Sequence, residues 1–278
     1  MIQRLVNIEL KRAVHSRGFW ISLIIGLSIS IIHIIHNLVG VVGYWNQADE
    51  VWINSFIYPE TVFSHWIGGN TYNIEGFLYF MIFPILAVLP CSAGFYDEIK
   101  DGYFKQVFTR CCRSDFLISK YLVTFLMGGI VIVVPLILNL MICMAMLQSL
   151  VPQEIAGKLV NASVLWYGIY ETHPYMYLLI FFVLEFVFGG MMACLSLMLT
   201  WFSDKKIVAL LFPFLLNIFI YSVCMMTGHP DAVKYSPVYF LLPAIGCPSW
   251  MLLIGYLIVL GGVSGYIFFQ TGKKTDLY

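Results

Sequence analysis

Six stretches of this chain are each long and apolar enough to cross a lipid bilayer. A spanning helix needs about 20 largely apolar residues, because inside the hydrocarbon the backbone must satisfy its own hydrogen bonds. Charged residues make up 11% of the 278 residues, whereas a soluble domain has roughly 25%, so they cannot cover a water-facing surface. The sequence therefore predicts an all-α integral membrane protein, a single transmembrane domain over 1–278, with spans at 19–42, 77–95, 116–147, 175–202, 207–227 and 250–270.

The distribution of Lys and Arg predicts the orientation of these spans. Basic residues gather before the first span, in the loops after the second and fourth spans, and in the C-terminal tail. Only Lys158 and Lys234 fall on the opposite side, and the segment 43–76 contains no Lys or Arg. Because basic loops stay in the cytoplasm, both termini are expected inside (N-in, C-in). We expect a multi-pass protein of the plasma membrane, specifically of a bacterial cell membrane.

The segment 1–17 ahead of the first span has the pattern of an amphipathic interfacial helix. Its basic residues Arg4, Lys11, Arg12 and Arg17 lie away from its apolar side chains on a helical wheel. Such a helix lies in the membrane interface with its basic side toward anionic lipid. The alternative is an ordinary basic leader before a first span. The expected apolar face comprises Ile2, Leu5, Val6, Leu10, Ala13 and Val14.

Two external segments are too polar or too short to span the bilayer. The segment 43–76 is rich in aromatic residues, which predicts interfacial helices or a small cap. The segment 228–249 contains four prolines, and its apolar part, 238–245, is shorter than a span. We expect this second segment to be re-entrant-like and to dip into the outer leaflet.

The loop 96–114 is the only cytoplasmic loop long enough to form structure of its own. It is dense in aromatic residues and in charges of both signs. Gly102 can end a turn, 103–109 can form a short helix parallel to the membrane, and Ser114 can cap the next helix. Such a helix would be a docking surface for a soluble partner. On the residues alone, a solvated loop that only sets topology is equally well supported.

This loop resembles the first cytoplasmic loop of ABC transporter permeases of the type-2 exporter class. The matching residues are Glu98, Gly102, Thr109, Arg110, Ser114 and Lys120. The plan of the whole chain is also similar to that family, although Cys111 stands where many members have Pro, and the first outer loop is long. The resemblance implies a cytoplasmic coupling helix that docks on an ATPase through Glu98, Gly102, Tyr103, Phe104, Lys105, Thr109, Arg110 and Arg113.

The resemblance also implies partners and a division of labour. Members of the family work as two permease subunits, or halves, with two nucleotide-binding ATPase subunits. The chain contains no G-x-x-x-x-G-K-[ST] loop, so ATP and Mg would be bound by the partner, with no cofactor and no catalytic residue here. A second copy of the chain or a related permease would complete the translocation path. The substrate would be an amphipathic or antimicrobial peptide, a lipid or a hydrophobic drug. The balanced net charge argues against nucleic acid, and no Cys/His spacing indicates a metal.

Three polar residues inside the spans are candidates for the substrate path or for an interhelical lock: Glu185, Asn139 and Asn217. A charge at the bilayer centre costs about 3 kcal/mol, so Glu185 is expected to be protonated, paired or facing a polar interior. Two rival functions stay open. The first is a channel or secondary transporter that works without an ATPase. The second is an intramembrane serine protease, because residues 262–265 match the GxSG motif of rhomboid-like proteases. Those enzymes need a His on a later helix, and no His follows Ser264 in the sequence.

Overall fold

The computed structural model describes residues 2–39, 61–70, 73–108, 111–149, 160, 162–229 and 232–274, with only the backbone at 104 and 105. The regular structure in these ranges is helical, with turns between the helices, and contains no strand beyond one isolated bridge, between Thr61 and Gln148. The predicted all-α class is therefore confirmed.

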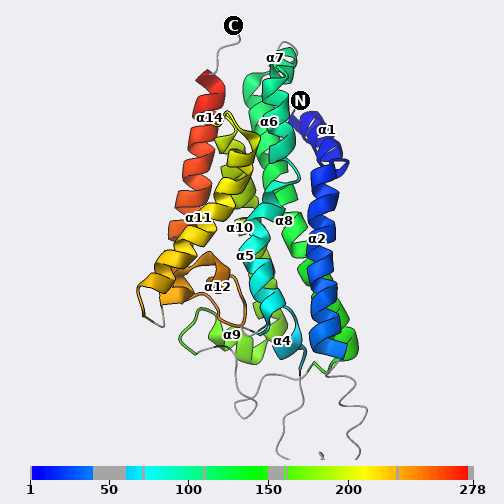
Figure 1. Cartoon of the computed structure of the whole chain (residues 1–278), viewed down its shortest axis with the longest axis vertical. Helices are drawn as coiled ribbons and strands as arrows, with labels where there is room; N and C mark the ends of the chain where they lie inside the picture. The colour runs from blue at the N-terminus through cyan, green and yellow to red at the C-terminus, as the bar shows by residue number, and fades with distance from the viewer. Residues whose placement is uncertain are drawn as a thin grey trace, which may run out of the picture.

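Six long apolar helices form the body of the protein (Figure 1), which confirms the predicted number of spans. They differ from the predicted ranges mainly at their ends. The second span extends beyond Phe95 to Lys100, and a turn at 89–91 divides it into two helices. The spans are Arg17–Leu38 (α2, Arg17–His33, and η1, Ile34–Leu38), Ile74–Lys100 (α5, Ile74–Val88, and α6, Ser92–Lys100), Arg113–Met146 (α8), Pro174–Leu199 (α10), Lys206–Met226 (α11) and Trp250–Lys274 (α13, Trp250–Tyr256; η4, Leu257–Val263; α14, Ser264–Lys274).

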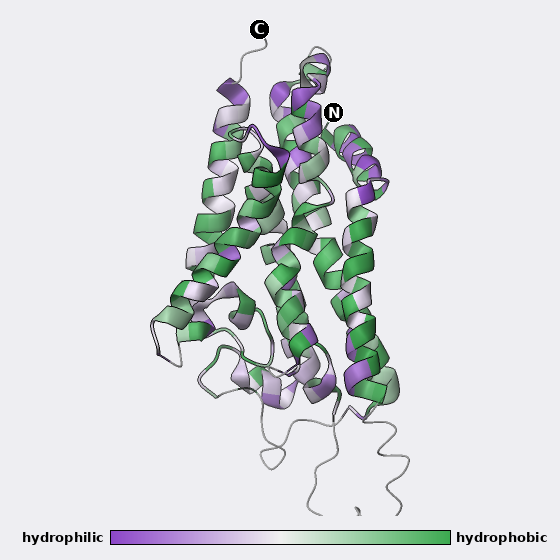
Figure 2. Ribbon diagram, viewed as in Figure 1, coloured by the Kyte–Doolittle hydropathy of each residue, from purple (hydrophilic) through white to green (hydrophobic). Residues whose placement is uncertain are grey.

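The two ends of the bundle differ in charge. The N-terminal helix α1 (Ile2–Val14), the short helix α7 (Tyr103–Phe108) and the end of α14 lie together at one end, which we call the basic end (Figure 1). Hydrophilic ribbon is concentrated there (Figure 2). The helices α4 (Val62–His65) and α9 (Tyr167–Thr172) lie at the opposite end, which we call the outer end after the orientation that the Lys and Arg residues predict. The described Lys and Arg residues of the basic end are Arg4, Lys11, Arg12, Arg17, Lys100, Arg113, Lys120, Lys205, Lys206, Lys273 and Lys274.

The helix α1 packs against α8 rather than standing free. Its buried face includes Ala13 and, in part, Leu5, Val6 and Leu10, as the sequence predicts. The face differs from the prediction at both ends, because Ile2 and Val14 are exposed. It also contains one unexpected residue, the buried acid Glu9. The helix is amphipathic, but a charge lies on its protein-facing side.

Helices α8 and α10 form the closest helix pair of the core. Gly128 and Gly129 of α8 meet Gly189 of α10, and Gly190 lies against Phe125 of α8; small residues allow two backbones to approach in this way. A Cβ added at Gly190 would lie 2.7 Å from the carbonyl oxygen of Phe125, so a larger side chain has no room. This contact holds the centre of the bundle together.

We expect Gly190→Val to destabilise the protein by about 3 kcal/mol, since the overpacked side chain would meet backbone that cannot move aside. The matched control is Gly262→Val in η4, where nothing lies within 4 Å of an added Cβ. Thermal unfolding of both variants in detergent measures the difference. Equal unfolding temperatures would show that the α8–α10 contact is looser than described.

The outer end is covered by chain that folds back onto the helices. A 3-10 helix η3 (Ala232–Tyr235) and α12 (Pro237–Phe240) lie against α11, and α12 also contacts α5. The Tyr177 hydroxyl donates a hydrogen bond to the carbonyl of Pro243 (2.8 Å). Val238 and Leu241 are buried. The apolar part of 228–249 is therefore buried by protein, while most of 43–76 lies outside the described residues.

Candidate functional site

A sharp turn joins the second span to the short helix α7. The helix α6 ends at Lys100, and Gly102 takes a φ of 68°, a left-handed conformation that favours glycine. The chain then enters α7 over Tyr103–Phe108. Gly102 and the short helix therefore lie where the sequence predicts them, and the turn brings Tyr103 back toward α1.

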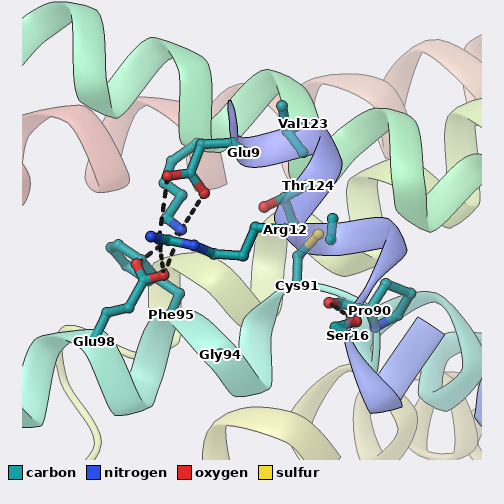
Figure 3. Close-up of a pocket in the computed structure, with 12 residues that line it drawn as sticks. Glu9, Arg12, Ser16, Pro90, Cys91, Gly94, Phe95, Glu98, Val123 and Thr124 are labelled. Carbon is teal, nitrogen blue, oxygen red and sulfur yellow. Dashed lines mark hydrogen bonds and ion pairs between the residues drawn. The ribbon is translucent and has the colours of Figure 1, made fainter. Parts of the chain in front are cut away.

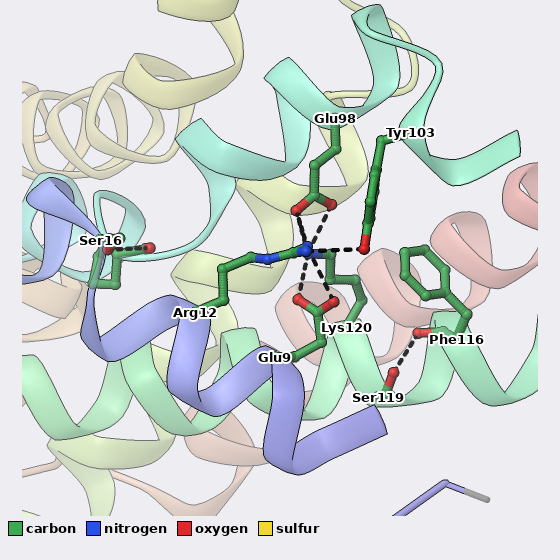
Figure 4. Close-up of polar contacts among 9 residues, drawn as sticks. Glu9, Arg12, Ser16, Glu98, Tyr103, Phe116, Ser119 and Lys120 are labelled. Carbon is green, nitrogen blue, oxygen red and sulfur yellow. Dashed lines mark hydrogen bonds and ion pairs between the residues drawn. The ribbon is translucent and has the colours of Figure 1, made fainter. Parts of the chain in front are cut away.

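Four charged side chains and one tyrosine form an ion network where α1, α6, α7 and α8 meet (Figure 4). Arg12 Nη1 lies 2.8 Å from Glu98 Oε1 and 3.5 Å from Glu9 Oε1. Arg12 Nη2 donates to the Tyr103 hydroxyl at 2.9 Å. Lys120 Nζ lies 2.5 Å from Glu9 Oε2 and 2.8 Å from Glu98 Oε2. Two cations and two carboxylates thus balance each other, and each cation contacts both acids.

Much of the ion network is shielded from water. The side chains of Glu9 and Lys120 are 7% and 9% exposed, and that of Glu98 is 14% exposed. The rings of Phe95 and Phe116 lie 5.6 and 5.8 Å from Lys120 Nζ, close enough for cation–π attraction. Removing one charge from such a group leaves its partner buried and uncompensated, so the loss of one member costs far more stability than the loss of one partner of a surface pair.

Arg12 lies at the open edge of the ion network, with 42% of its side chain exposed. Its guanidinium stacks on the Tyr103 ring, 4.8 Å from the centroid. Burial alone would lower the pKa of Arg12, but the Tyr103 hydrogen bond and the charges of Glu9 and Glu98 outweigh it and raise the pKa. Arg12 therefore stays charged and fixes α7 to α1.

A cavity of about 50 Å³ lies beside the ion network, between α1, α6 and α8 (Figure 3). It is large enough for a few water molecules, since each needs about 10–15 Å³ and polar neighbours. At its far side, Ser16 donates to the carbonyl of Pro90 (3.0 Å) and accepts from the Phe19 backbone (3.2 Å). The corner between α1 and α2 is therefore fixed to the break in the second span.

The surface next to the ion network is hollowed. An open depression of about 410 Å³ is bordered by α1, α6 and α7, with Asp97, Asp101 and Tyr103 among its lining residues. Asp97 also pairs with Lys206 at 2.5 Å in an exposed ion pair. This depression gives the basic end a concave surface beside α7.

The predicted docking residues fall into three groups. Glu98 and Tyr103 belong to the ion network, and Gly102 forms the turn. Arg113 begins α8, where its Nη1 donates to the carbonyl of Lys273 (2.5 Å) and its guanidinium covers the Phe108 ring at 4.9 Å. For Phe104 and Lys105 only the helical backbone is described, and Thr109 and Arg110 lie outside the described residues.

Sequence reasoning missed two members of the ion network as site residues. Glu9 and Arg12 both come from α1, which the sequence suggests only as a lipid-facing helix. The available signal was Glu9 itself, an acid four residues from Ala13 and from Leu5 and therefore on the apolar face. Lys120 is part of the pattern that resembles the family, but the sequence did not assign it to the docking surface. In the structure it contacts both carboxylates of the ion network and lies against two aromatic rings.

The three polar residues inside the spans do not form one site in the described part of the chain. Asn139 on α8 lies near the outer end and makes hydrogen bonds with Ile67, Ser30 and His33. Asn217 on α11 donates to the carbonyl of Met81 (3.4 Å). Glu185 on α10 is 1% exposed, and neither of its oxygens has a hydrogen-bond partner among the described residues. Only Asn139 is part of a polar cluster.

Glu185→Gln is expected to change the free energy of unfolding by less than about 1 kcal/mol, since the amide keeps the shape of a neutral carboxyl group that has no described partner. Glu185→Lys provides the contrast, because a buried ammonium costs several kcal/mol. Thermal unfolding in detergent compares the two. A large loss in Glu185→Gln would mean that the carboxyl makes a specific contact.

No protein-family model matches this sequence, and no curated protein matches it. The structure establishes a multi-span membrane protein that associates with a lipid bilayer.

Proposed function

We propose that this chain is the membrane-spanning permease subunit of an ATP-driven exporter of the ABC type-2 class. The observation that carries the proposal is the ion network. Glu98 and Lys120, both part of the pattern that resembles this family, lie 22 residues apart in sequence and form an ion pair of 2.8 Å. Tyr103 of α7 joins them through Arg12. A short helix held this firmly at the basic end is suited to receive force from a soluble partner.

The proposed mechanism follows from what the ion network connects. A separate ATPase would bind α7 and the neighbouring depression, and ATP-driven closure of two ATPase subunits would move α7. Because Arg12 and Lys120 fix α7 and α6 to α1 and α8, the movement passes to α8. This helix has 34 residues and so reaches about 50 Å, from one end of the bundle to the other.

The partners and substrate follow from the same proposal. ATP and Mg would be bound by the ATPase, and two copies of this chain, or this chain and a related permease, would border the path. The apolar spans suit an amphipathic or antimicrobial peptide, a lipid or a hydrophobic drug. The expected site of action is a bacterial cell membrane, with the basic end in the cytoplasm.

A channel or secondary transporter that works without an ATPase is the second candidate. The observation in its favour is Glu185, a buried carboxyl without a described hydrogen-bond partner, because such groups in spans often serve ion or proton pathways. It explains neither the short helix α7 nor the ion network behind it, so we rank it second.

Purification of the tagged chain from its native membrane in mild detergent tests the proposal. A soluble ATPase with its own phosphate-binding loop should co-purify in near-equal amount. The chain running alone as a defined oligomer would contradict the proposal and favour the second candidate. A tagged Arg12→Ala/Tyr103→Ala variant is the matched comparison, and we expect it to retain less of the ATPase.

A further inference from the structure

At the outer end, the side-chain amide of Asn139 has a fixed orientation. Its Oδ1 accepts the backbone N–H of Ile67 at 2.9 Å, and its Nδ2 donates to the carbonyl of Ser30 at 3.2 Å. Turning the amide over would place two donors together at Ile67 and two acceptors together at Ser30. The remaining N–H of Nδ2 points at Nδ1 of His33, 3.3 Å away.

This orientation fixes the protonation state of His33. Because Asn139 presents a donor, Nδ1 of His33 must accept, so the ring is neutral and carries its proton on Nε2. Nε2 lies 3.1 Å from Nδ2 of Asn73, and a half-turn of that side-chain amide places its oxygen there to accept this proton. His33 is fully buried. A second proton on the ring would have to sit on Nδ1, facing the Asn139 donor.

Asn139 in turn holds a segment that closes the outer end. We call residues 61–70 the outer seal. Trp66 and Ile67 are fully buried, and Trp66 packs edge-on against Phe182 of α10 at 5.7 Å. The carbonyl of Gly68 accepts from Ala244 at 3.1 Å, so the outer seal also joins the re-entrant-like segment. Its bond to α8 itself is the Ile67–Asn139 contact, and just past the end of α8 the Val62 N–H donates to the carbonyl of Gln148 at 3.2 Å.

We propose that His33 is an acid-sensitive latch for the outer seal. While the ring is neutral, Asn139 holds Ile67 and the seal stays in place. When Nδ1 takes up a proton, two donors face each other, so Asn139 must withdraw or turn and loses its bonds to Ile67 and Ser30. Acid on the outer side therefore loosens the seal. This inference does not depend on an ATPase partner.

Other ionisable groups lie around the His33 ring. The titratable groups whose charges act on the ring are Glu75 on α5, His65 in α4 and His36 in η1. Glu75 pairs with His36 at 2.8 Å, and the His36 side chain is 73% exposed. From α8 the ring meets Asn139, behind which the Cys143 thiol lies 3.8 Å from Oδ1.

Hydrogen–deuterium exchange of residues 61–70 tests the latch, with the protein in lipid nanodiscs and rates corrected for intrinsic exchange. We expect exchange of the outer seal to rise about tenfold between about pH 8 and about pH 5, as one restraining hydrogen-bond set is lost. His33→Gln should remove this pH step, because a glutamine does not titrate. His36→Gln, the control at the exposed histidine, should keep it.

Asn139→Asp gives the reciprocal test. A carboxylate would accept both from Ile67 N–H and from a protonated Nδ1, so acid should now protect the outer seal instead of loosening it. Equal protection of the wild-type seal at both pH values overturns the proposal. A pH step that persists in His33→Gln, or that keeps its direction in Asn139→Asp, also overturns it.

Discussion

Replacing Lys120 by Met is expected to lower the free energy of unfolding by about 3 kcal/mol or more, because it leaves Glu9 and Glu98 facing each other without their buried cation. Both carboxylates contact Nζ within 2.8 Å, and Glu9 has only 7% of its side chain exposed. Arg12, at the exposed edge, cannot compensate for both. Thermal unfolding of the purified variant in detergent measures the loss.

Two variants make this prediction specific. Lys206→Met removes a cation from the exposed pair with Asp97, at the same end of the protein and at the same 2.5 Å, and should cost less than about 1 kcal/mol. Adding Glu9→Gln and Glu98→Gln to Lys120→Met removes the repulsion and should restore much of the stability. If Lys120→Met and Lys206→Met unfolded at the same temperature, the ion network would not be a structural element.

The double change Phe104→Ala/Arg110→Ala is expected to abolish transport and to weaken ATPase binding at least about thirtyfold, while leaving membrane insertion intact. Hot-spot residues at protein interfaces, among which aromatic and Arg side chains are prominent, cost about 2 kcal/mol or more when truncated, so the loss of a single one corresponds to about thirtyfold. Phe104 lies within α7, and Arg110 follows it in the chain. Quantification of the co-purified ATPase measures the effect.

The matched control is Phe202→Ala/Lys205→Ala, in the other loop at the basic end. Phe202 is 61% exposed, so it offers an accessible aromatic residue close in sequence to a basic one. This control should retain the ATPase at wild-type level. Equal retention in both double variants would remove the docking role from α7 and leave it as a connecting helix.

The fold was largely predictable because its signals are local. A span is about 20 consecutive apolar residues, and the number and order of the spans follow from hydropathy alone. The turn at Gly102 and the helix after it are equally local features. The uneven placement of Lys and Arg predicts that both termini share one end, and they do (Figure 1).

The site was less predictable because it depends on pairs that are far apart in sequence. Lys120 and Glu9 are 111 residues apart, and Arg12 and Tyr103 are 91 apart. No periodic pattern predicts that these side chains meet. Asn139 was predicted as part of the substrate path or of an interhelical lock, but its contact with Ile67 depends on how the outer seal folds back across the bundle, and its contact with His33 depends on how α2 packs against α8. Glu9 is the one case where a local clue was present, as an acid on an apolar helical face.

The most direct test of the central claim, that a separate ATPase docks on α7, is photo-crosslinking in the native membrane. Benzoylphenylalanine at Phe104 keeps an aromatic side chain on α7 and should give an adduct with a soluble protein that carries a phosphate-binding loop. The same probe at Tyr235, which is 48% exposed at the outer end, should give no such adduct. Adducts at Phe104 with lipid alone, or with the same proteins as at Tyr235, would contradict the account.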